Sequence, residues 1–169
     1  MALNHDTEAW QTKLAALPLA SYGPDEMVFA EGTNTGRLLI LKTGAVSIVK
    51  GGVEIAQVSE PGAVFGDLSA LLGQSHTADV HTLESSEFHV AEAAALLLQD
   101  PVVLLYITMG LARRLDGANQ ALLELKNMLR AGESPSVIGK TIDRIEGLLN
   151  SIGTGYLRAG AAYSMYPFA

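Results

Sequence analysis

The apolar positions change their spacing twice along the chain. Trp10, Leu14 and Leu17 lie on one face at helical spacing, which predicts a short helix that Pro18 interrupts. From there to Val90 short apolar runs are divided by glycine and proline, as is typical of strands joined by tight turns. The predicted strands are 27–30, 38–42, 45–50, 53–58, 77–82 and 86–90. Many short strands with regular turns predict a β-sandwich or barrel, and Gly51-Gly52 predicts a hairpin.

Helical spacing returns at Glu92 and dominates the C-terminal part. Asp100-Pro101 predicts the start of a long helix reaching about Leu129, because Asp caps free N–H groups and Pro fits the first helical position. Its apolar positions alternate four and three residues apart, as in a coiled-coil seam, with Thr108 in the one polar slot. The seam consists of Leu104, Leu111, Leu115, Ala118, Leu122, Leu125 and Leu129.

This seam predicts a homodimer, because a long exposed leucine stripe on a monomer would be prone to aggregation. We expect the near half of the helix to pack on its own strands and the far half to face the partner. The predicted contacts are Leu111, Leu115, Leu122, Leu125 and Leu129.

Residues 131–169 are expected to form a helical, aromatic-rich tail after a domain spanning residues 1–130. Ser134-Pro135 predicts a further helix start. Its apolar stripe, Val137/Ile138, Ile142, Ile145 and Leu149, is expected to fold back on the domain or on its dimer mate. The last stretch, residues 153–169, carries little charge and is therefore expected to be packed on something rather than disordered.

Composition and charge argue against several functions. The formal net charge of −7 disfavours nucleic acid as a partner, since such binding depends on neutralising phosphates. The chain has no cysteine, no signal-peptide pattern and no apolar run of the roughly 18 residues that span a membrane. His76 and His81, five residues apart on a strand, would face opposite sides, and no nucleophile motif is present. We therefore expect a cytoplasmic, non-enzymatic protein with no catalytic or metal-ligating residues and no membrane partner.

The stretch from Phe65 to Val80 carries the candidate site. Its residues predict a strand end, a turn at Gly66, a short helix, a second turn and a new strand. The first-turn N–H groups of the short helix, beside Ser75, His76 and Thr77, favour an anion. The three leucines on its other side, Leu68, Leu71 and Leu72, are expected to anchor it to the core.

This stretch resembles the phosphate-binding cassette of the cyclic-nucleotide-binding domain family. The family pattern runs Phe-Gly-Glu-Leu-Ala/Ser-Leu-Leu and, a few residues later, Pro-Arg-Ser/Thr-Ala-x-Val. The matching residues are Phe65, Gly66, Leu68, Ser69, Leu71, Leu72, Thr77, Ala78 and Val80. The resemblance extends from about Leu14 to Leu125. It implies an α+β fold, an antiparallel, jelly-roll-like β-roll with a flanking N-terminal helix, a long C-terminal helix and a short helical tail.

The resemblance also implies a binding site for cyclic AMP or cyclic GMP, with no other cofactor. Its residues would be Gly66, Asp67, Leu68, Ser69, Ser75, His76 and Thr77. Asp67 stands where the family has a glutamate that accepts hydrogen bonds from the ribose hydroxyl, and His76 stands where it has the arginine that binds the phosphate. If His76 takes the arginine's role it should do so as imidazolium, so that affinity rises as the pH falls toward and below about 6.5.

The expected function is that of a regulatory sensor. The β-roll would bind a small ligand, and the long helix would carry the result to a dimer mate or another protein. Transcription factors of this family append a winged helix-turn-helix, but residues 131–169 offer only one good amphipathic helix, so DNA binding is not expected. The alternative is a ligand-independent protein-interaction or dimerisation module that has kept the fold and lost the nucleotide.

Overall fold

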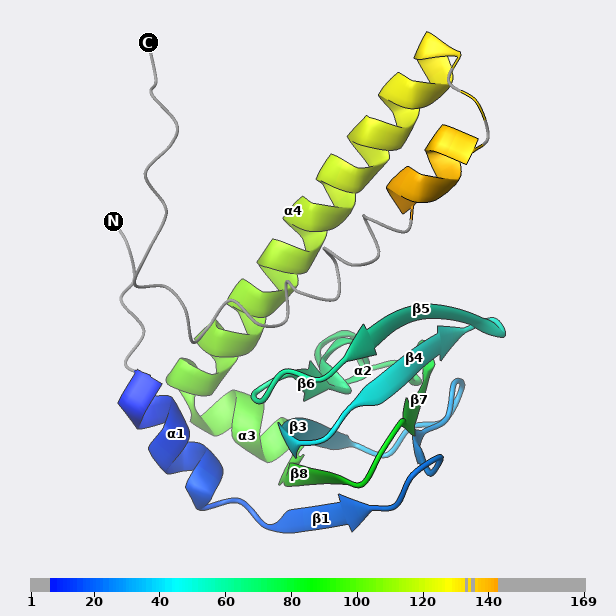
Figure 1. The fold of residues 1–169 in the computed structure, drawn as a ribbon. Coiled ribbons are helices and arrows are strands. Elements are labelled where there is room, and N and C mark those ends of the chain that lie inside the picture. The colour runs from blue at the N-terminus through cyan, green and yellow to red at the C-terminus, as the bar shows by residue number, and fades with distance from the viewer. Residues whose placement is uncertain (1–6, 133, 135, 143–169) are drawn as a thin grey trace, which may run out of the picture.

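Two four-stranded antiparallel sheets face each other in the computed structural model, which describes residues 7–132, 134 and 136–142 (Figure 1). The strand orders are β1-β8-β3-β6 and β2-β7-β4-β5. The strands are β1 Leu19–Tyr22, β2 Met27–Phe29, β3 Arg37–Thr43, β4 Val46–Lys50, β5 Val53–Val58, β6 Val64–Phe65, β7 Asp79–Thr82 and β8 Ser86–Glu92. The helices labelled in Figure 1 are α1 Thr7–Ala15, α2 Asp67–Leu72, α3 Ala93–Gln99 and α4 Pro101–Ala131. The predicted β-roll with a flanking helix and a long C-terminal helix is confirmed.

All six predicted strands are present, with shifts of one or two residues at their ends. The strand expected to begin at Thr77 begins at Asp79, and the strand end expected at Phe65 is β6. Strand β1 was not predicted, because its four residues are only exposed or half-buried and show no buried apolar face. Its antiparallel pairing with β8, from Leu19 opposite His89 to Tyr22 opposite Ser86, defines it instead.

Strand β3 separates two apolar cores. Its successive residues point to opposite faces, as in any strand, so that two of them serve each core. Leu38 and Ile40 are buried among the helices, whereas Leu39 and Leu41 are buried between the two sheets. Because both faces are covered, the strand consists of a nearly continuous apolar run rather than an alternating one.

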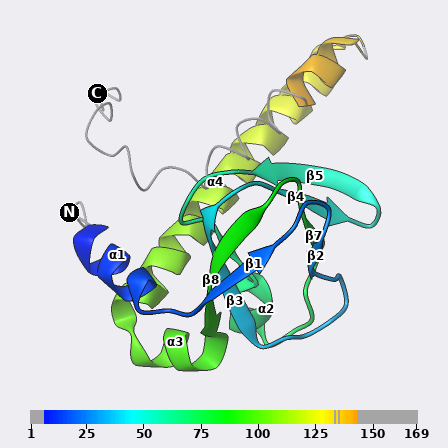
Figure 2. The same ribbon diagram turned by 60° about the horizontal axis from the view of Figure 1, so that its bottom comes forward.

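Helices α1 and α3 lie beside the near end of α4, next to the sheet that contains β1 and β8 (Figure 2). Trp10 and Leu14 of α1 are buried as the helical spacing predicted, and Trp10 stacks on Tyr106 of α4 with ring centroids 4.0 Å apart. Val103 and Ile107 are buried in the same core. The helices therefore join the near half of α4 firmly to the β-roll.

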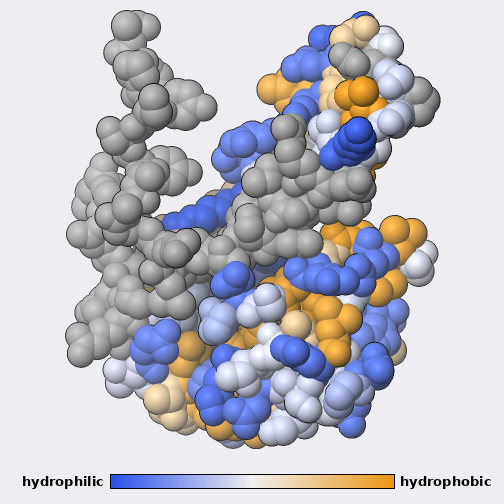
Figure 3. Space-filling model, in the orientation of Figure 1, coloured by the Kyte–Doolittle hydropathy of each residue, from blue (hydrophilic) through white to orange (hydrophobic). Residues whose placement is uncertain are grey.

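The two halves of α4 differ in burial. The near half packs on the β-roll as predicted, although through Val103, Tyr106 and Ile107 rather than Leu104, which is exposed. The far half is exposed, with Leu115, Leu122 and Leu129 each more than 60% accessible. In Figure 3 apolar surface shows at this far end and around the β4–β5 hairpin. The predicted dimer remains a prediction, and the exposed far half is the surface it requires.

A helix at residues 136–142 follows the turn at Gly132, as Ser134-Pro135 predicted. It lies beside the far end of α4 (Figures 1 and 2). Val137 and Ile142 are exposed, while Ile138 is half-buried. The predicted continuation of this stripe, Ile145 and Leu149, and the aromatic segment 153–169 lie outside the described residues. The division of the chain into residues 1–130 and 131–169 stays a prediction.

No single helix among residues 7–132, 134 and 136–142 is both long enough and apolar enough to cross a membrane. Helices α3 and α4 reach that length and composition only as a pair that bends by 105°.

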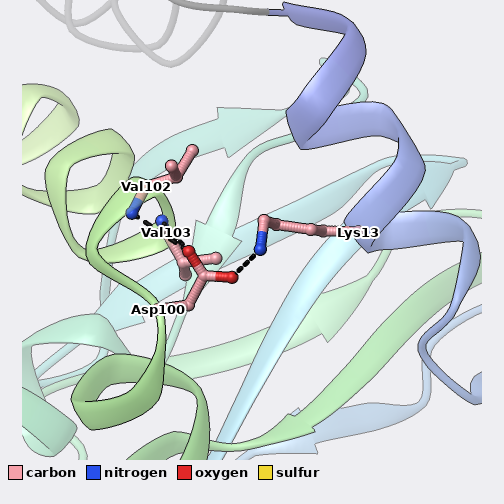
Figure 4. Close-up of polar contacts among 4 residues, drawn as sticks. All are labelled: Lys13, Asp100, Val102 and Val103. Atoms are coloured by element: carbon pink, nitrogen blue, oxygen red, sulfur yellow. Dashed lines mark hydrogen bonds and ion pairs between the residues drawn. The ribbon is translucent and has the colours of Figure 1, made fainter.

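The start of α4 yields a stability prediction at Asp100. Its carboxylate accepts the backbone N–H groups of Val102 and Val103, at 3.0 and 3.3 Å, and pairs with Lys13 of α1 (Figure 4). We expect Asp100→Ala to lower the free energy of unfolding by about 1–2 kcal/mol, because it removes a helix cap and an ion pair together. The melting temperature should then fall by roughly 2–8 °C for a chain of this size.

Asp100→Asn is the matched control, because asparagine caps a helix as well as aspartate but carries no charge. It should cost well under about 1 kcal/mol, since the Lys13 side chain is 39% exposed and water screens the pair. Equal losses for the two variants in thermal melts would contradict the assignment of most of the effect to the cap.

Candidate functional site

A pocket of about 400 Å³ is lined by the cassette around α2, by strands β4 and β5, and by α4. This volume lies within the range of small-molecule sites. Six of the seven predicted site residues line it: Gly66, Asp67, Leu68, Ser69, His76 and Thr77. The seventh, Ser75, is exposed and is not part of the lining. Helix α4 contributes Tyr106, Ile107, Gly110 and Arg114, so the pocket is shared between the β-roll and the long helix.

The short helix α2 is turned differently from the prediction. Leu68 and Leu71 are each 38% exposed and Leu72 is 64% exposed, so the expectation that they anchor the helix to the core is wrong. The buried residues of α2 are Asp67 and Ser69. The reason is that both polar side chains have hydrogen-bonding partners, which makes their burial possible: Asp67 pairs with Arg114 of α4, and Ser69 bonds to Gly66 and His76. Apolar spacing alone could not indicate this.

Asp67 connects the cassette to α4. Its side chain is only 7% exposed and forms an ion pair with Arg114 of α4, whose side chain is 42% exposed. Its other carboxylate oxygen accepts the N–H of Leu68 at 2.9 Å. Both oxygens of this buried carboxylate therefore have a partner. The ion pair also fixes the first residue of α2 to the side of the long helix.

His76 lies inside the wall of the pocket rather than on a solvated loop. The residue is only 5% exposed, and its ring stacks on the ring of Phe29 with centroids 4.1 Å apart. Nδ1 lies 3.1 Å from the hydroxyl of Ser69, and Nε2 lies 3.0 Å from the hydroxyl of Thr35. Both ring nitrogens are thus hydrogen-bonded within the fold.

The hydrogen bonds of Ser69 indicate which tautomer His76 adopts. The Ser69 hydroxyl donates to the carbonyl oxygen of Gly66 at 2.9 Å, so it can only accept from the histidine. Nδ1 of His76 therefore carries the proton and donates to Ser69, and Nε2 accepts from the Thr35 hydroxyl. This arrangement uses a neutral imidazole.

Burial lowers the pKa of His76 below its ordinary value. The imidazole is therefore neutral near pH 7 in the free protein. The imidazolium role expected for His76 would require a ligand to overcome this burial and to break a hydrogen bond. That role remains untested, and the geometry does not favour it.

A pH dependence of stability follows from the lowered histidine pKa values. Burial lowers the pKa of both His76 and His89, and for His89 the nearby Lys42 lowers it further. Between the lowered folded value and about 6.5, the unfolded chain binds more protons than the folded one. The free energy of unfolding should therefore be highest above about pH 6.5 and should decline as the pH falls below that value. Urea denaturation at pH 7.5, 6.5 and 5.5 would measure the decline.

The variant His76→Gln should weaken this dependence and leave the part that His89 contributes, because glutamine cannot gain a proton but can still form hydrogen bonds. A free energy of unfolding that stays constant or rises between pH 6.5 and 5.5 in the unmodified chain would contradict the prediction.

Several pocket residues were not predicted, above all Arg114, Lys50 and Phe29. A weak signal for Arg114 was present, because Ile107, Gly110 and Arg114 are three and four residues apart and share one helical face. A charged side chain on the helix face that packs against the rest of the fold indicates a polar partner on the element it packs against. The sequence does not show that this partner is Asp67, which lies 47 positions earlier.

The fold and the pocket together define a β-roll whose pocket is walled in part by its own C-terminal helix. Residues 19–97 match the family described as the cyclic nucleotide-binding domain, and this part of the chain belongs to that family. The match covers both sheets, the cassette and most of α3. The chain matches no curated protein sequence.

Solved structures share the fold at low sequence identity. The Thermus thermophilus catabolite activator protein is 21% identical, with a TM-score of 0.61, over 91% of this chain and 98% of that one. The c-di-GMP-responsive global regulator CLP of Xanthomonas campestris is 16% identical, with a TM-score of 0.60, over 84% and 92%. The second cyclic-nucleotide-binding domain of a PKA regulatory subunit, bound to Sp-2Cl-cAMPS, is 20% identical, with a TM-score of 0.53, over 75% and 80%. The chain covers 39% of a longer match, the cAMP-bound PfPKA-R (141–441), with a TM-score of 0.49.

Proposed function

We propose that the protein is a regulatory sensor whose β-roll binds a cyclic nucleotide and whose α4 helix transmits the binding to a second copy of the chain. Membership of the cyclic nucleotide-binding domain family supports a sensory or regulatory role. The observation that carries the proposal is the composition of the pocket wall. Its cassette residues and its α4 residues lie around one cavity, so a ligand there would contact the β-roll and the helix at once.

The cassette offers two kinds of ligand contact. Most of the pocket wall is apolar, including Ile48, Val58 and Phe65, which suits the flat face of a base. Backbone groups around Gly66 and the hydroxyl of Thr77 offer polar contacts that do not depend on an arginine in the cassette. Cyclic AMP and cyclic GMP are the ligands proposed for this site.

Helix α4 is the element able to carry a signal. Its near half is packed in the core, whereas its far half bears an exposed leucine stripe. A ligand that shifts the contact between α2 and α4 would therefore move the surface on which the dimer depends. We propose that the dimer is the form through which the sensor acts.

The second candidate is an interaction module that binds no nucleotide. It is favoured by one specific observation, namely that His76 is buried with both ring nitrogens already hydrogen-bonded. In this case the Asp67–Arg114 ion pair would be a permanent structural contact, and the exposed leucines of α2 and α4 would serve protein partners alone.

Titration of the full chain with cyclic AMP and cyclic GMP separates the two candidates. The sensor proposal expects a rise in melting temperature and calorimetric heat with at least one of them, because a ligand that binds only the folded state stabilises it. The substitution Ala78→Trp, which places a large side chain in the pocket wall, should abolish both signals while the protein remains folded. Absence of heat and of thermal shift with both nucleotides at millimolar concentration would favour the interaction module.

A further inference from the structure

We infer that Arg114 of α4, positioned by Asp67, binds the anionic phosphate of the ligand in place of an arginine from the cassette. This inference rests on the proposed function and adds to it the residue that recognises the charge. It also changes the role of Asp67, which would act on the arginine rather than on the ribose.

The charges that line the pocket support this assignment. The basic side chains in the lining are Lys50, His76 and Arg114, and the acidic one is Asp67. His76 is neutral near pH 7 in the free protein, and Lys50 is an exposed residue at the end of β4. A cyclic phosphodiester carries a full negative charge, and its transfer into a largely apolar pocket needs a fixed positive partner. Arg114 is the lining residue that supplies one beside the cassette.

The geometry of Arg114 leaves part of its guanidinium available. Nη2 donates to Oδ2 of Asp67, and no other hydrogen bond of the Arg114 side chain is found among residues 7–132, 134 and 136–142. A guanidinium has five N–H donors in a fixed plane, so Nε and Nη1 remain for a second anion. The side chain is 42% exposed and lines the pocket, so a ligand in the pocket can reach it.

Asp67 is suited to hold this arginine still. Its carboxylate is 7% exposed and is itself fixed by the N–H of Leu68 at 2.9 Å. An arginine held by a buried carboxylate loses less conformational freedom when it binds a ligand, so the contact gains affinity. Asp67 is thus a positioning residue.

This contact would link ligand binding to signalling. The phosphate would be bound by the helix that bears the exposed leucine stripe, so the ligand's charge would act on α4 itself. The cassette would contribute its backbone and its neutral His76–Ser69 pair as a wall for the same ligand.

The test is calorimetric titration of the full chain with cyclic AMP and cyclic GMP, using three substitutions. Arg114→Gln should weaken binding by about tenfold to a hundredfold, because charge-assisted hydrogen bonds are lost. Arg130→Gln is the matched control, since it removes the same charge from the same helix about 24 Å farther along, and it should leave the affinity unchanged. The double variant Asp67→Asn/Arg114→Gln avoids an unpaired buried carboxylate and should lose the same affinity while melting like the unmodified protein.

Two further readouts separate this assignment from a histidine contact and from a purely structural ion pair. Affinity should stay constant between pH 6 and 8, whereas a phosphate-binding imidazolium would make it rise as the pH falls. Asp67→Asn alone should weaken binding yet keep its salt dependence, because Arg114 retains its charge, whereas Arg114→Gln should lose much of that dependence.

A wild-type chain that binds neither nucleotide overturns the proposed function and this inference together. Binding that survives Arg114→Gln and the double variant at full strength overturns this inference alone. Affinity that rises tenfold between pH 7 and 6 would assign the phosphate to His76 and would also overturn it. Tighter binding by Asp67→Asn would show that the carboxylate competes with the ligand, which contradicts a positioning role.

Discussion

Gly66→Ala should lower the melting temperature by roughly 6–12 °C and remove any nucleotide binding. Gly66 has φ +86°, a left-handed conformation that costs an L-residue about 1–2 kcal/mol. A Cβ at this position would also lie 2.6 Å from the carbonyl oxygen of Arg37 and 3.3 Å from the ring of Phe29. The conformational cost and the steric overlap together amount to about 3 kcal/mol. The backbone shift that relieves the overlap would displace the start of α2 from the pocket.

Gly73→Ala is the matched control at the other end of the same short helix. Gly73 has φ +64° but no atom within 4 Å of an added Cβ, so only the conformational cost of about 1 kcal/mol remains. It should lower the melting temperature by roughly 2–4 °C and leave nucleotide affinity intact. If the two alanine variants melt alike, the close approach of Arg37 and Phe29 has no energetic role.

The course of the β-roll could be predicted because its signals are local. Tight turns favour glycine or proline, and most of the predicted strands are bounded by such residues, as at Gly51-Gly52. The start of α4 was equally local, since the capping carboxylate of Asp100 immediately precedes the helix. Strand β1 lacked a local signal, because it exists through hydrogen bonds to β8, a strand that comes almost 70 residues later in the chain.

The candidate site could be predicted only on its cassette side. Gly66, Asp67, Ser69 and Thr77 follow one another closely, so a sequence pattern can contain them. The partners of the buried polar groups come from far along the chain: Thr35 for His76, and Arg114 for Asp67. The orientation of α2 depends on those partners, which is why the expectation that Leu68, Leu71 and Leu72 point inward was wrong. Apolar spacing indicates a helix face but not which face the rest of the fold can satisfy.

Leu122→Glu should convert a dimer to a monomer. Leu122 lies in the predicted seam and is 65% exposed in the single chain. In a two-fold dimer one substitution acts twice, and each buried leucine contributes about 1.5–3 kcal/mol. Loss of both, with two new like charges facing each other, should weaken association at least about a hundredfold. Sedimentation of the two proteins over a range of concentrations would measure this.

Leu123→Glu is the control that tests the seam rather than mere hydrophobicity. Leu123 is 59% exposed, lies on the same turn and would gain the same charge, but it points about 100° away around the helix. It should leave the dimer intact, because the four-and-three spacing that joins Leu115, Leu122 and Leu129 excludes it. Dissociation by Leu123→Glu but not by Leu122→Glu would place the interface on another face of α4. An unmodified chain that sediments as a monomer at every concentration would leave the exposed leucines to a different protein partner, and signalling through a homodimer would then have to be abandoned.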